Sequence, residues 1–131
     1  MRKAASLFLG TLILAAAPAM ASPSADGEAK LAQVLEGRVA GAPVDCLTQR
    51  DIRSTRIINR TAIVYETRGG TLYVNRPEAG AQSLSHWDVL VTDTRSPRLC
   101  DIDVVHLYDS TARMRNGFVS LGEFIPYRKA D

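Results

Sequence analysis

The sequence predicts a mainly β domain with one short N-terminal helix, built as an antiparallel meander sheet or a small barrel of about six strands with one disulfide. Residues 52–76 are the clearest part, because β-branched and aromatic residues are concentrated there and two tight turns divide them into three strands. Cys46 lies just before this stretch and Cys100 well after it. These features define a sheet and a cross-link.

The first 21 residues have the pattern of a secretory signal peptide. A basic head, Met1-Arg2-Lys3, precedes an apolar run over 4–17, and Pro18-Ala19-Met20-Ala21 supplies the small residues of a cleavage site. The run is shorter than the roughly 20 apolar residues of a transmembrane helix. We therefore expect cleavage after Ala21, a periplasmic or secreted location, and no stable membrane insertion.

Removal of that segment changes the charge. Without Arg2 and Lys3 the 16 basic residues become 14, equal to the 14 acidic ones, so the remaining chain is formally neutral. A neutral exported domain is a poor match for nucleic-acid binding, and none is expected. We divide the rest into an N-terminal helix and linker at 22–44 and a disulfide-stapled β domain at 45–131.

The two cysteines are expected to form a disulfide, because an exported chain meets an oxidising environment. A bridge between Cys46 and Cys100 would stabilise the fold by about 4 kcal/mol at most through loop-closure entropy. Its Cα atoms should then lie within roughly 4.4–6.8 Å of each other.

Further elements follow from periodicity and turn residues. Residues 26–36 form a helical pattern in which Leu31, Val34 and Leu35 share a face, and 40–43 is expected as a linker. Asn59-Arg60 and Gly69-Gly70 are the predicted turns between the three strands of 52–76. Later strands are predicted at 86–92, 100–108 and 118–127, with Asn116-Gly117 as a turn before the last.

His86 and His106 are the only histidines and are weak candidates for a metal site with Asp88, Asp101 and Asp103. Polar residues at alternate strand positions more commonly mark a solvent face, so no metal and no cofactor are expected. The sequence contains no G-x-S-x-G, P-loop or G-x-G-x-x-G motif, and no catalytic residue is assigned.

The densest basic run is Arg50, Arg53, Arg56 and Arg60. Guanidinium groups bind carboxylates and phosphates through paired hydrogen bonds, so Arg53 and Arg56 are candidates for anionic small-ligand binding. Such a run is more commonly a solvated strand face paired with Glu66 and its neighbours across the sheet.

Three segments resemble a family of small exported proteins of Gram-negative bacteria known as a domain of unknown function. The segments are DCLTQRDIRSTRIIN (45–59), RGGTLYVNRP (68–77) and RLCDIDVVHLYD (98–109), together with SLGEFIPY (120–127). The I-R-S-T-R segment at 52–56 is the most specific part. Members of that family usually have four cysteines, and the two that this chain lacks would lie in the regions that correspond to 77–84 and 118–121. The resemblance thus implies loss of one whole bridge and favours pairing the remaining two.

The resemblance implies no activity. We expect a non-catalytic binding module of the bacterial envelope, acting on an envelope protein through an edge strand or an apolar patch. The alternatives are a small hydrolase or metal-dependent enzyme using His86 or His106 with aspartates, and a binder of small anions through Arg53 and Arg56.

Overall fold

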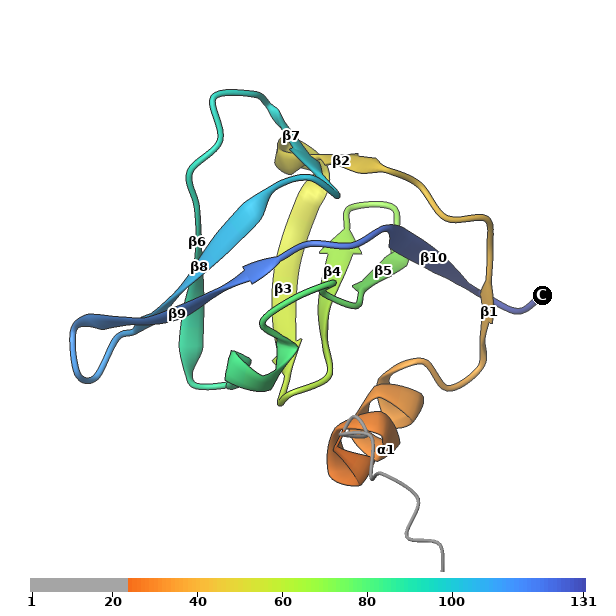
Figure 1. Ribbon diagram of the computed structural model, residues 1–131. Helices are drawn as coiled ribbons and strands as arrows, with labels where there is room; N and C mark the ends of the chain where they lie inside the picture. The colour runs from red at the N-terminus through yellow and green to blue at the C-terminus, as the bar shows by residue number, and fades with distance from the viewer. Residues whose placement is uncertain (1–23) are drawn as a thin grey trace, which may run out of the picture.

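The computed structural model describes residues 24–131 as a mainly β protein with one α-helix. The predicted signal peptide lies outside the described residues. Helix α1 (Ala25–Val34) is followed by strands gathered into three antiparallel sheets (Figure 1). The strands are β1 (Arg38–Ala40), β2 (Cys46–Thr48), β3 (Ile52–Ile58), β4 (Ala62–Thr67), β5 (Leu72–Asn75), β6 (Asp88–Thr92), β7 (Arg98–Cys100), β8 (Val104–Asp109), β9 (Met114–Ser120) and β10 (Phe124–Lys129). Within 24–131, no helix is long and apolar enough to cross a membrane.

The largest sheet has five strands in the order β1-β10-β5-β4-β3. The predicted three-stranded stretch makes up one side of it, where β3, β4 and β5 form the expected antiparallel meander. Gly70 adopts positive φ (83°) in the second turn. In the first turn the residue with positive φ is Arg60 (55°) rather than Asn59, while the Thr61 N–H donates to the Ile58 carbonyl oxygen.

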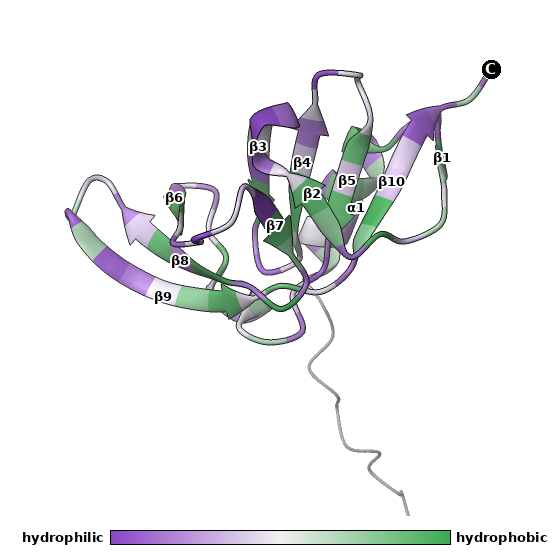
Figure 2. Cartoon of the chain, turned by 90° about the horizontal axis from the view of Figure 1, so that it is seen from above, coloured by the Kyte–Doolittle hydropathy of each residue, from purple (hydrophilic) through white to green (hydrophobic). Residues whose placement is uncertain are grey.

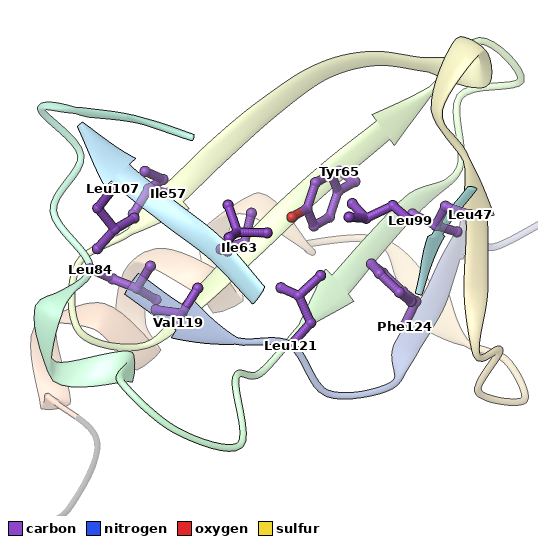
Figure 3. Packing of buried hydrophobic residues seen from close by; sticks show 11 residues of the cluster. Leu47, Ile57, Ile63, Tyr65, Leu84, Leu99, Leu107, Val119, Leu121 and Phe124 are labelled. Atoms are coloured by element: carbon purple, nitrogen blue, oxygen red, sulfur yellow. The ribbon is translucent and has the colours of Figure 1, made fainter. Parts of the chain in front are cut away.

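Strand β4, which lies between β3 and β5, is buried on both sides at residues 62–65, and this explains its continuous apolar run. Ala62 and Val64 face α1, where they contact Leu31 in a cluster completed by Ile58, Leu72 and Val74. Ile63 and Tyr65 face the other way, into the main core (Figure 3). That core lies between the five-stranded sheet and the two smaller sheets, and its other members are Leu47, Ile57, Leu84, Leu99, Val105, Leu107, Val119, Leu121 and Phe124.

Helix α1 begins where the Ser24 hydroxyl accepts a hydrogen bond from the Gly27 N–H (3.0 Å). Leu31 is its anchor in the sheet. Glu28 adds a bidentate ion pair with Arg76 at the end of β5, with N···O distances of 2.6 and 3.0 Å. The Arg76 guanidinium lowers the pKa of Glu28. The predicted helix is confirmed, and Gly37 (φ 73°) follows its end.

The disulfide between Cys46 and Cys100 is present and joins β2 to β7 in a two-stranded sheet. The two residues are direct cross-strand partners. Their Cα atoms are 4.0 Å apart, which is shorter than the predicted range.

Three sequence predictions about strands were wrong in detail. The strand expected over 100–108 is two strands, because the Asp103 carboxylate accepts the Cys100 N–H (2.7 Å) and closes a turn at 101–103. The strand expected over 118–127 breaks at 121–123, where the buried Asn75 side chain bonds both the N–H and the carbonyl of Gly122 (3.0 and 2.6 Å). These two breaks, together with the unpredicted strands β1 and β2, give ten short strands in place of about six.

The Asn116-Gly117 pair is also not a turn. It lies inside β9, where the register with β8 shifts and Gly117 has φ 131°. This is a β-bulge, and the actual turn precedes it, with Arg113 at φ 56°. Two architectures were predicted, an open meander sheet and a small barrel. The described strands form separate open sheets and do not close a barrel. The linker predicted at 40–43 is preceded by β1, which pairs with β10.

Candidate functional site

The three-stranded sheet, in the order β6-β8-β9, stands at the opposite end of the molecule from β1 and β10 (Figures 1 and 2). Its inner face supplies Val105, Leu107 and Val119 to the main core, all fully buried. The alternate residues of these strands lie on the opposite side of the sheet. We call the following set the outer face: Val89, Val91, Val104, His106, Tyr108 and Phe118.

The outer face is apolar and open. Val89, Val91, Val104 and Phe118 are 51%, 44%, 42% and 57% exposed, while His106 and Tyr108 are half-buried among them. Strand pairing places Val91 opposite His106 and His106 opposite Phe118, so these three form one row across the sheet. The rings of His106 and Phe118 meet edge to face, with centroids 6.4 Å apart.

A hollow of about 310 Å³ lies on this face, lined by Val91, His106, Tyr108 and Arg115. Arg115 pairs with Tyr108 across the strands, which brings a guanidinium group to an otherwise apolar site. An apolar side chain would fit the hollow, with a carboxylate beside Arg115.

His86 lies elsewhere, in the turn before β6. Its backbone N–H donates to the Asn59 Oδ1 (2.7 Å), and its Nδ1 lies 2.9 Å from the same oxygen. Because a backbone N–H is always a donor, the Asn59 atom that faces it must be the carbonyl oxygen. Nδ1 therefore carries a proton and donates as well, which leaves Nε2 as the free acceptor of the neutral ring.

Two of the three aspartates predicted to assist the histidines have other partners. Asp88 is buried and accepts from the Asn116 Nδ2 in the β9 bulge, at 3.3 and 3.1 Å. The Asp103 carboxylate closes the turn after Cys100. Within residues 24–131, no group of three or more His, Cys, Asp or Glu side chains is arranged to hold a metal ion.

The candidate arginines are exposed on β3, an edge strand of the five-stranded sheet. Arg56 lines a hollow of about 330 Å³ between β3 and the edge strand β6, together with His86 and Asp88. Arg53, at the point where the register of β3 with β4 shifts, does not line this hollow. The structure thus brings Arg56 near a histidine and a carboxylate but does not pair it with Arg53.

The outer face was missed as a site in the sequence. The sequence shows that Val89 and Val91 lie on one face of their strand, and Val104 and His106 on one face of theirs. In β8, however, apolar residues occur at both the odd-numbered and the even-numbered positions. Which parity faces the core depends on the partner sheet, so periodicity alone does not identify the exposed one.

No family model, curated protein or solved structure matches this chain.

Proposed function

We propose that this protein is a non-catalytic binding module, exported to the periplasm or secreted, that docks an envelope protein on the outer face of its three-stranded sheet. The observation that carries the proposal is the exposed apolar row of Val91, His106 and Phe118 on a sheet whose opposite side is already fully packed. Folding buries the inner face and leaves the apolar side chains of the outer face exposed among residues 24–131.

The composition of the face favours a protein partner. Isolated exposed apolar residues are ordinary, whereas a contiguous group is typical of interaction sites. Aromatic and Arg side chains around a small hollow are also common at the centre of protein interfaces. The hollow with Arg115 at its side is complementary to a partner segment that carries an apolar side chain next to an acidic one.

The two alternatives have less support. Binding of a small anion through Arg56 would bring the anion beside the Asp88 carboxylate, which lines the same hollow and repels negative charge. An enzyme using His86 or His106 would need a carboxylate partner, and the hydrogen bonds of Asp88 and Asp103 go to Asn116 and to the Cys100 backbone.

The test is co-purification after chemical crosslinking in the native cell. Wild-type protein should recover a specific partner, and the double variant Val91→Ser/Phe118→Ser should lose it, because two apolar contacts become polar. Val39→Ser is a matched control, since Val39 is an exposed valine on β1 at the other end of the molecule. Circular dichroism would confirm that all three proteins are folded.

An unchanged set of co-purified proteins from the double variant would contradict the proposal. Repeated recovery of the wild-type protein alone would contradict it as well.

A further inference from the structure

A third hollow, a cleft of about 830 Å³, lies beside α1 and is separate from the outer face. Its walls are α1, the turn between β3 and β4, and the segment that leads into β6. The side chains around it are chiefly uncharged hydrogen-bonding groups, including Gln33, Asn59, Gln82 and Ser83. Asp26, Lys30 and Arg60 add charges of both signs, so the cleft is not built for a strongly charged ligand.

The cleft also contains Trp87, the only tryptophan of the chain, with 75% of its surface exposed. A ring of this size in solvent contributes nothing to the core. In the turn before β6 it is the largest apolar surface available to a ligand.

Trp87 is held in place by its neighbour. Its ring lies against the His86 imidazole, with centroids 4.3 Å apart and planes tilted by 41°. The His86 residue is held in turn, because its imidazole Nδ1 and its backbone N–H both bond the Asn59 Oδ1, and Asn59 belongs to the turn between two strands of the main sheet. A ring held this way loses little conformational entropy when a ligand covers it.

We propose that this cleft binds a saccharide, with a sugar ring stacked on Trp87. A pyranose ring has one face of C–H groups that suits an aromatic surface, and hydroxyls at its edge that suit amide side chains. The cleft offers both kinds of contact side by side, in a volume that holds a short oligosaccharide. Neither a purely apolar ligand nor a polyanion would match this mixture of groups. This site is independent of the proposed protein-docking face.

Because Trp87 is the only tryptophan of the chain, its fluorescence can report binding at this site without a label. Fluorescence excited at the indole band comes from Trp87 alone, so the purified protein can be titrated directly. The probes are the N-acetylglucosamine tetramer and the glucose tetramer, with adenosine monophosphate as a stacking ligand that is not a sugar oligomer. We expect a saturable change in emission with at least one tetramer below about 10 mM. A flat response to both tetramers over that range would overturn the proposal, as would a stronger response to the nucleotide.

Calorimetric titration with the better tetramer then locates the contact. Trp87→Ala should weaken binding at least tenfold, and His86→Ala should weaken it less, because the imidazole acts only by holding the indole. Val91→Ser on the outer face should bind the sugar as wild type does, even though it carries one of the changes that impairs protein docking. Unaltered sugar affinity in Trp87→Ala would rule out this cleft as the site. The docking proposal would be unaffected by that result.

Discussion

The hydroxyl of Tyr65 is the buried side-chain oxygen or nitrogen that lacks a hydrogen-bond partner among residues 24–131. Tyr65 is 2% exposed and points into the main core (Figure 3), where its ring meets Phe124 edge to face at 5.7 Å. The aromatic ring supplies packing, while the hydroxyl is removed from water without compensation. At this position the ring stabilises the fold and the oxygen opposes it.

We therefore expect Tyr65→Phe to raise the free energy of unfolding at neutral pH by about 1 kcal/mol, since only the unpartnered hydroxyl is removed. Denaturant titration of both proteins measures the difference. A loss of more than about 1 kcal/mol would indicate that the hydroxyl has a partner such as a buried water.

The same residue predicts an alkaline limit to stability. Burial raises the pKa of Tyr65 well above that of the tyrosine in the unfolded chain. The folded protein thus keeps the proton where the unfolded chain releases it, so stability is full below about pH 10 and falls as the pH rises further. Thermal unfolding between pH 8 and pH 11 should show this fall in wild type and a smaller one in Tyr65→Phe. Parallel curves would contradict the assignment.

At the scale of elements, helix α1 covers one face of the five-stranded sheet through Leu31, which is 2% exposed in the cluster with Val64 and Val74. The Glu28–Arg76 pair adds a second connection, but both side chains are partly exposed and such pairs contribute at most about 1 kcal/mol. The apolar contact is the stronger of the two.

Leu31→Ala should lower the free energy of unfolding by about 2–5 kcal/mol, because it leaves a cavity under the helix. Lys30→Ala, at the adjacent exposed position, is the control and should change it by less than about 0.5 kcal/mol. Equal effects of the two substitutions, measured by chemical denaturation, would mean that α1 is not docked as described.

Helices and strands that are formed by interactions between residues close in sequence were predicted, whereas features that depend on distant residues were not. Strands β3 to β5 and helix α1 were predicted because local residues specify them: a dense apolar run, tight turns and helical spacing. Gly122 suggested a bend in the strand expected over 118–127, but the full break between β9 and β10 depends on Asn75, which is distant in sequence and bonds Gly122. The candidate residues His86 and Arg56 were named from the sequence, but their common hollow with Asp88 exists only once β3 and β6 face each other.

Across the whole molecule, the disulfide joins parts that the local hairpins leave separate. Cys46 and Cys100 are 54 residues apart, and the bridge holds β2 against β7 over one end of the main core. Leu47 and Leu99, next to the two cysteines, are both buried in that core. The cross-link and the packing therefore stabilise the same region.

Reduction of the bridge should lower the free energy of unfolding by up to about 4 kcal/mol, through the regained entropy of the unfolded chain. The measurement is denaturant unfolding with and without reductant, and Cys46→Ser/Cys100→Ser should reproduce the reduced protein. An unfolding midpoint that does not move on reduction would show that the bridge adds no stability.

The proposed function of the protein depends most on the outer face as a docking surface for another protein. Its most direct test is a photoreactive phenylalanine analogue placed at Phe118 and, in a separate control protein, at Val39, with illumination in the native cell. Both residues are exposed, and their strands, β9 and β1, lie at opposite ends of the molecule (Figure 1). We expect position 118 to give a discrete crosslinked product with one partner protein and position 39 to give none. The proposal that a partner protein docks on the outer face would be contradicted if position 118 gave no crosslinked product, or only the products obtained from position 39.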